Sequence, residues 1–177
     1  TRITNNIVIA INVNIIDFLF ILQKHTSLFK KVAKVYKAFR IFSFMNFYDE
    51  IATGYEELHK EEQLKKIGLI KKYLKLKLKD NLLDVGCGTG LTTEHWRCKR
   101  YGIDPSLKLL KRARQKDKVV YKKAFAEKIP YKDDFFDVVV SITAIQNFKN
   151  IEKGLEEIKR VGKSKFVLTF LKKSSKR

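Results

Sequence analysis

Residues 82–90 have the sequence LLDVGCGTG, in which a short apolar run leads into three alternating glycines. Such a run predicts a buried strand, and the glycines allow a tight turn whose main chain a ligand can approach closely. A turn of this kind, at the carboxyl end of a strand, is where open α/β sheets bind ligands. The spacing disfavours two common ligands, because a nicotinamide fingerprint needs glycine where Leu91 stands and a P-loop needs Gly-Lys-Ser/Thr.

Helical and strand patterns alternate from residue 46 onward. Strands are expected at residues 81–85, 101–104, 119–122, 135–141 and 165–171. Helices are expected at residues 47–74, 91–97, after Pro105, and at 151–161, the last with Asn150 as N-cap and Gly162 as C′ residue. Strands separated by helices are joined by right-handed crossovers. The sequence therefore predicts an α/β fold, a Rossmann-like, doubly wound, mostly parallel sheet with helices on both faces.

Two further motifs follow the glycine turn. Residues 101–106, YGIDPS, place Asp104 at the end of the next strand. A carboxylate there can accept hydrogen bonds from both hydroxyls of a ribose, as in dinucleotide-binding folds, or it can cap the following helix. Residues 124–131, AFAEKIPY, are followed by DFFDVVVS at residues 134–141, which ends in the continuous apolar run of a strand buried on both faces.

These three motifs, in this order and spacing, resemble the class I S-adenosylmethionine (SAM)-dependent methyltransferases. The resemblance is to the methyltransferase type 11 group, which includes the ubiquinone/menaquinone methyltransferases. Upstream, residues 47–55, FYDEIATGY, resemble the helix that covers the cofactor in that group. The resemblance extends over roughly residues 46–171 and implies SAM as the cofactor.

The resemblance also implies which residues hold the cofactor. The glycine turn would surround its amino acid end, Asp104 would bind the ribose, and the loop around Ala126 would follow the adenine edge. The implied set is Asp84, Gly86, Cys87, Gly88, Gly90, Asp104, Pro105, Ala126, Glu127, Ser141 and Tyr55. The chain departs from the group at Phe125, where a polar residue, commonly Asp, is frequent. Adenine recognition should therefore rest on stacking and on the backbone around Ala126.

The sequence contains no motif that identifies the methyl acceptor. The segment SITAIQNF at residues 141–148 lacks the Asn/Asp-Pro-Pro-Tyr/Phe sequence of enzymes that methylate exocyclic or amide nitrogens, and the Pro-Cys nucleophile of cytosine-C5 enzymes is also absent. His95 is better explained by packing or exposure, so we assign no catalytic base. We expect a methyltransferase that acts on an unidentified O, N or C nucleophile. The alternative is a catalytically silent module of the same fold that binds RNA or a partner.

The net charge of +19 has two interpretations. Clustered Lys and Arg release counterions from phosphates, which would suit an RNA partner. A lysine-biased composition spread over solvated helix faces would give the same charge without RNA. A small-molecule substrate and RNA both stay open, and the oligomeric state is not indicated.

Cysteine content and hydropathy favour a cytoplasmic protein. The two cysteines are too few for a disulfide framework and fit no zinc pattern. The apolar stretch at residues 7–22 is interrupted by Asn12, Asn14 and Asp17 and is short for a membrane span, so we expect no stable membrane insertion.

The two ends of the chain differ from the methyltransferase-like region. Residues 1–45 have a different composition, and the only methionine is Met45. We predict that residues 1–44 are an upstream extension without evolved structure, with a functional leader as the alternative, that 46–171 are the methyltransferase domain, and that 172–177 are a basic tail. The resemblance implies a C-terminal antiparallel hairpin beside the fifth strand, which this chain lacks. A strand edge should then be uncovered, as in a gene fragment, a reduced fold or a protein with a partner.

Overall fold

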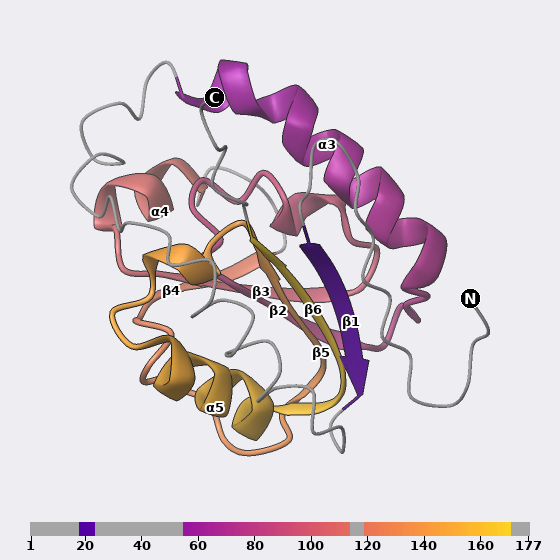
Figure 1. Ribbon diagram of the computed structural model, residues 1–177, viewed down its shortest axis with the longest axis vertical. Helices are drawn as coiled ribbons and strands as arrows, with labels where there is room; N and C mark the ends of the chain where they lie inside the picture. Colours follow the sequence, from indigo (N-terminus) through magenta and orange to yellow (C-terminus); the bar gives the residue numbers. More distant parts are fainter. Residues whose placement is uncertain (1–17, 24–54, 114–118, 171–177) are drawn as a thin grey trace, which may run out of the picture.

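The computed structural model describes residues 18–23, 55–113 and 119–170, and its core is a six-stranded sheet in the order β1-β6-β5-β2-β3-β4 (Figure 1). The strands are β1 (Phe18–Gln23), β2 (Asn81–Val85), β3 (Lys99–Asp104), β4 (Val119–Lys123), β5 (Phe136–Ile142) and β6 (Gly162–Phe170). The strands β2 to β6 pair in parallel, and β1 pairs antiparallel with β6. The predicted α/β class with a mostly parallel sheet is confirmed.

Helices cover both faces of this sheet, as Figure 1 shows for α3 and α5. They are α3 (Tyr55–Tyr73), η1 (Thr93–His95), α4 (Leu107–Ala113), η2 (Ile145–Asn147) and α5 (Ile151–Val161). Successive residues of β5 pack on opposite faces of the sheet. Val138 packs with Ile67 and Ile70 of α3. Val139 packs with Leu155 and Ile158 of α5. Among the residues described, no helix is long and apolar enough to cross a membrane.

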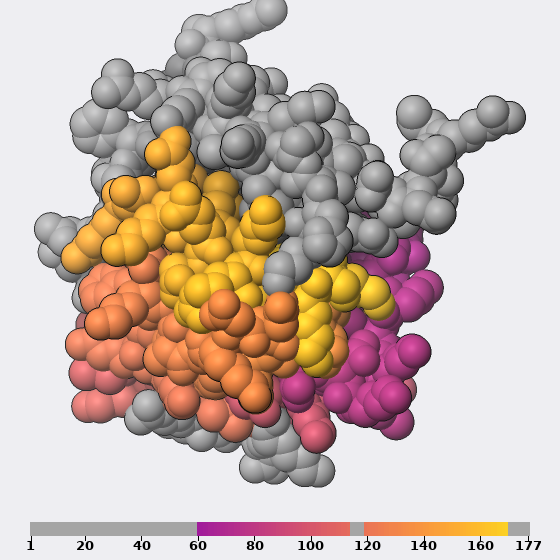
Figure 2. Space-filling view, turned by 90° about the horizontal axis from the view of Figure 1, so that it is seen from below, coloured from indigo at the N-terminus to yellow at the C-terminus, as the bar shows by residue number. Residues whose placement is uncertain are grey.

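The C-terminal end of α3 lies beside β6. Figure 2 shows the magenta residues of α3 next to the yellow residues near the C-terminus. The Nζ atom of Lys165 in β6 donates to the carbonyl of Lys75, just after α3, at 3.1 Å. In α3 and directly after it, the apolar side chains of Ile67, Ile70 and Leu74 are buried, whereas that of Leu64 is exposed.

The structure agrees with one expected helix cap and differs from two other local predictions. Asn150 does cap α5, because its Oδ1 accepts from the amide of Lys153 at 3.0 Å. Gly162 is not a left-handed C′ residue, since its φ is −95° and β6 begins there. The helix expected at residues 91–97 is reduced to η1, because the hydroxyls of Thr92 and Thr93 are tied to Asp84 and β-branched residues propagate a helix poorly. Residues 47–54 lie outside the described part of the chain.

The edge of β6 is covered by β1, from Phe18 opposite Phe170 to Gln23 opposite Lys165. The fifth strand of the parallel order thus has an antiparallel neighbour from the N-terminal segment, where the resemblance implied one from a C-terminal hairpin. The rest of residues 1–45 lies outside the described ranges. The boundary at residue 45 stays a prediction, and the pairing of β1 gives a reason to test it.

A chain that starts at Met45 lacks β1 and should be less stable than one that starts at Asp17. Its free energy of unfolding should be lower by roughly 2 kcal/mol or more, because each lost ladder hydrogen bond contributes about 1 kcal/mol. Urea denaturation of both chains measures the difference. Equal stability would show that β6 does not need β1 and would support the boundary predicted at residue 45.

Candidate functional site

The glycine turn joins β2 to η1 at the carboxyl edge of the sheet, and its three glycines have different surroundings. Gly86, Gly88 and Gly90 have φ values of 78°, 55° and 78°, in the left-handed region that favours glycine. A Cβ atom on Gly86 would lie 2.4 Å from the Cβ of Ala144, and one on Gly90 would lie 2.2 Å from the Tyr121 hydroxyl. A Cβ on Gly88 would meet nothing closer than a methyl of Leu109 at 4.0 Å. The outer glycines are therefore closely packed, whereas among the described residues only Leu109, at van der Waals distance, lies near the Cβ position of Gly88.

Asp84 lies buried beneath this turn. Its Oδ2 accepts hydrogen bonds from the hydroxyls of Thr92 at 2.6 Å and Thr93 at 2.7 Å, which holds the start of η1 against β2. Within the described residues, its Oδ1 is buried without a hydrogen-bond partner. Burial raises the pKa of Asp84 to about 6, although the two threonine hydroxyls act in the opposite direction. The turn thus contains an unpaired acceptor that would suit a cationic donor.

Asp104 fixes the middle of the turn to the end of β3. Its Oδ2 accepts from the amide of Gly88 at 2.9 Å, and its Oδ1 accepts from the amide of Ser106 at 2.8 Å. Ser106 caps α4, since its hydroxyl accepts from the amide of Leu109 at 3.3 Å. Ser106, rather than Asp104, bonds to an amide inside α4, while Asp104 bonds to the amide of the residue that precedes the helix. The Asp104 carboxylate lies beside Gly88, the least crowded glycine of the turn among the described residues.

The loop after β4 brings the expected adenine-edge residues to the same edge of the sheet. The amide of Ala124 donates to the carbonyl of Asp104 at 3.2 Å, and Ala126 is buried. The Glu127 carboxylate accepts from the amide of Asn150 at 2.9 Å, so it joins the loop to the start of α5. Phe125 is 40% exposed, with the ammonium of Lys149 4.5 Å from its ring centroid. Its ring is thus accessible, as stacking would require.

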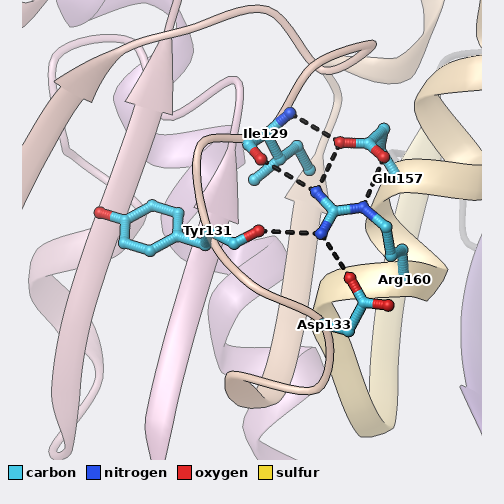
Figure 3. A network of polar contacts seen from close by, with 5 residues as sticks. All are labelled: Ile129, Tyr131, Asp133, Glu157 and Arg160. Carbon is cyan, nitrogen blue, oxygen red and sulfur yellow. Dashed lines mark hydrogen bonds and ion pairs between the residues drawn. The ribbon is translucent and has the colours of Figure 1, made fainter.

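Arg160 anchors the continuation of this loop to the end of α5 (Figure 3). Its guanidinium donates to the carbonyls of Ile129 at 3.0 Å and Tyr131 at 2.9 Å and to the carboxylates of Asp133 and Glu157, both at 2.7 Å. Glu157 also accepts from the amide of Ile129 at 2.9 Å, and the bond from Arg160 lowers the pKa of Glu157. Sequence analysis missed this network, because Glu157 and Arg160 are spaced like an ordinary surface pair on a helix.

The remaining predicted site residues differ in how deeply they are buried. Ser141 is fully buried, and its hydroxyl donates to the carbonyl of Val85 at 3.0 Å, so it joins β5 to β2 below the turn. Cys87 is buried, and desolvation raises the pKa of its thiol well above the ordinary value, which disfavours a thiolate nucleophile. Pro105 is exposed next to Asp104. Tyr55 begins α3, but its side chain lies outside the described part of the chain.

The contrast between Gly88 and Gly90 can be tested by matched substitutions. Gly90→Ala should lower the free energy of unfolding by about 3 kcal/mol or more, because the left-handed backbone and the overpacking against Tyr121 both oppose it. Gly88→Ala should cost only the backbone term, about 1–2 kcal/mol. Urea denaturation of both variants is the measurement, and equal losses would contradict the assignment.

Asp84→Asn should change the pH dependence of stability. The folded-state pKa of about 6 lies above the ordinary value of 3.8, so the folded chain binds the proton more tightly than the unfolded chain. The contribution of Asp84 to stability is therefore largest below pH 4 and falls as the pH rises towards 6. The variant should gain roughly 2–3 kcal/mol relative to the wild type between pH 4 and pH 7, measured by urea denaturation. A constant difference across this range would show that Asp84 does not titrate there.

Comparison with known proteins places this architecture in a family. The family model described as a methyltransferase domain matches residues 83–170, from β2 to the end of β6. A demethylmenaquinone methyltransferase from Chlorobaculum parvum is 29% identical over 135 residues, which cover 67% of this chain and 55% of that protein. A malonyl-[acyl-carrier protein] O-methyltransferase from Hamiltonella defensa is 36% identical over 93 residues, 50% of this chain and 36% of that protein.

The solved structures agree with these relatives. A SAM-dependent methyltransferase from Thermotoga maritima, described as a possible histamine N-methyltransferase, superposes with a TM-score of 0.60 at 25% identity. The match covers 68% of this chain and 57% of that one. The chain spans about half the length of the first curated relatives it matches. The glycine turn, Asp104 and the parallel sheet all lie within the matched region, and the chain belongs to the class I SAM-dependent methyltransferase family.

Proposed function

We propose that this protein transfers the methyl group of SAM to a nucleophilic O, N or C atom of an acceptor. The observation that carries the proposal is the arrangement at Gly88, which has the most room of the three glycines among the described residues and whose amide is bonded to the buried carboxylate of Asp104. The Oδ1 of Asp84, to which no described residue donates, adds an acceptor below the turn that would suit an ammonium group.

The residues present suit the different parts of SAM. The glycine turn and Asp84 would hold the amino acid end, Asp104 the ribose hydroxyls, and the loop with Phe125 and Ala126 the adenine ring. When SAM is bound, it supplies an electrophilic methyl carbon on a positively charged sulfur.

The contribution of the protein to this reaction would be positioning and exclusion of water. Asp104 fixes the turn to β3, and Glu127 and Arg160 fix the adenine-edge loop to α5, so the two halves of the site are held by separate rigid elements. A site held in this way would orient SAM and the acceptor without a covalent link to the protein. We assign no side chain as a general base.

A small molecule is the acceptor class that we favour. The curated relatives include proteins named for demethylmenaquinone and for norajmaline. Many lysines in the described region lie on exposed surfaces of α3, where Lys65 pairs with Glu61 at 2.7 Å. This distribution fits a compositional origin of the net charge. RNA is the alternative, since Lys122, Lys123 and Lys128 are exposed around the adenine-edge loop.

The purified protein should bind SAM and its demethylated product and should not bind NAD. Asp104→Ala should weaken SAM binding by roughly 1.5–3 kcal/mol, the range for hydrogen bonds to a charged group, as measured by calorimetry. Glu61→Ala removes an exposed carboxylate of α3 outside the turn and the adenine-edge loop, and is the matched control. Unchanged SAM affinity with a lower melting temperature would mean that Asp104 only supports the turn.

The same preparations can test the transfer reaction and the acceptor class. Labelled SAM should methylate a component of a metabolite extract in preference to total RNA, and Asp104→Ala should reduce the transfer. Selective methylation of RNA would replace the small-molecule assignment. Tighter binding of NAD than of SAM would overturn the proposed function.

A further inference from the structure

The segment that ends α3 and follows it carries an unbalanced positive charge. Residues 71–80, KKYLKLKLKD, contain five lysines and one aspartate, and all five lysines are exposed. Earlier in α3 the charges are balanced, since Lys65 pairs with Glu61 and Lys66 pairs with Glu62. Among the described residues, no carboxylate forms an ion pair with the five lysines. Their charge is therefore available to a partner from outside the chain.

A hydrogen-bonded turn shapes the end of this segment. The amide of Asp80 donates to the carbonyl of Lys77 at 3.0 Å, and the carboxylate of Asp80 accepts from the amide of Lys77 at 2.9 Å. Leu78 and Lys79 lie between these residues, at the tip of the turn. Because two bonds close the turn, the backbone at its tip is held in one conformation.

Leu78 is the most exposed large apolar side chain among the described residues, at 79%. The alternating sequence would place it with Leu74 and Leu76, which pack into the core between α3 and the sheet. The turn redirects the chain before Leu78 can follow them. A leucine that stands directly between Lys77 and Lys79 is thus held in solvent by the bonds of the turn.

The basic segment lies at the amino edge of the sheet, opposite the glycine turn. Asp80 directly precedes β2, and its carbonyl accepts from the amide of Lys99, the first residue of β3, at 3.0 Å. The exposed side chain of Lys99 adds to the charge there. In Figure 2 the magenta residues, which include α3, lie at the surface. Because the glycine turn follows β2, the basic segment and the cofactor turn lie at opposite ends of the same strand.

Lysines around an apolar tip suit an anionic lipid surface better than a nucleic acid. Lysines are attracted to acidic headgroups, and an apolar side chain among them gains by entering the apolar layer beneath. Tyr73, which is 46% exposed at the end of α3, has the amphipathic ring that is common at such interfaces. A phosphate backbone offers an aliphatic side chain no apolar surroundings. Arginine, which binds phosphates in a bidentate manner, is absent from residues 71–80.

We propose that residues 71–80, together with Lys99, form a docking surface for a membrane that contains anionic lipids. The lysines lie against the headgroups and Leu78 enters the interface, which needs no membrane-spanning helix. The glycine turn, at the other end of β2, points away from the membrane. The surface positions the protein and does not depend on the proposed function or on the methyl acceptor.

Sedimentation of the full chain with lipid vesicles tests the charge of this surface. The chain should bind phosphatidylcholine vesicles that contain roughly one third phosphatidylserine at least tenfold more tightly than pure phosphatidylcholine vesicles. The double variant Lys77→Gln, Lys79→Gln should weaken binding by roughly tenfold or more, because each lysine near an anionic surface contributes about fivefold. The matched control Lys60→Gln, Lys65→Gln removes the same charge from exposed positions earlier in α3 and should leave binding within about twofold.

A second set of variants tests the apolar tip at constant charge. Leu78→Gln should weaken vesicle binding by about fivefold or more, because the polar side chain gains nothing from the apolar layer. Leu78→Ile should bind like the wild type. Leu64→Gln makes the same change at the exposed leucine of α3 and should also leave binding unchanged. Thermal unfolding of each variant checks that the fold is intact.

Several results would overturn the inference. The wild type could fail to bind either kind of vesicle, or bind both equally. An equal loss in the Lys60, Lys65 variant would show that net charge, rather than this surface, causes binding, and a Leu78→Gln variant that binds like the wild type would exclude the apolar tip. Binding to total RNA that requires Lys77 and Lys79, without binding to vesicles, would assign the surface to nucleic acid. None of these measurements involves SAM, so the proposed function is tested separately.

Discussion

The hydrogen bond from the amide of Gly88 to the buried carboxylate of Asp104 is the contact on which the site depends. It joins the turn after β2 to the end of β3 and fixes Gly88, the glycine of the turn with the most room among the described residues. The outer two glycines pack closely against Ala144 and Tyr121. The turn is thus held at all three of its glycines, by packing at the outer two and by a hydrogen bond at Gly88.

The second half of the site is built by a different element. The loop after β4 has no regular structure of its own at Phe125–Glu127, and α5 supplies its rigidity. Glu127 binds the start of α5 and Arg160 reaches back from the end of it, so the helix holds the loop at two places about one helix length apart. A loop held in this manner can present backbone atoms to an adenine edge although its sequence lacks the usual polar side chain.

The sequence was sufficient for the parallel sheet, the glycine turn and the position of Asp104 at the end of β3, because apolar runs and glycine spacing are local signals. It was insufficient where a contact joins distant segments. The antiparallel pairing of β1 with β6 has no local signature in the sequence. The hydrogen bond from the Lys66 ammonium to the Thr143 hydroxyl joins residues 77 positions apart. Lysine at position 66 looked like any other lysine of an amphipathic helix, and only the fold shows that it is buried. The helix expected at residues 91–97 is only the short η1, because the hydroxyls of Thr92 and Thr93 bond to Asp84, a contact that the sequence did not indicate.

The position of β1 has a consequence for how the chain folds. Its partner strand, β6, is the last regular element of the described chain, so the ribosome completes the β1 segment long before the edge that it pairs with exists. Contacts between such distant segments slow folding, because the closure of a long loop precedes any gain from the contact. The sheet can therefore be completed only after synthesis has passed β6, and until then the segment of β1 is open to pairing with other chains.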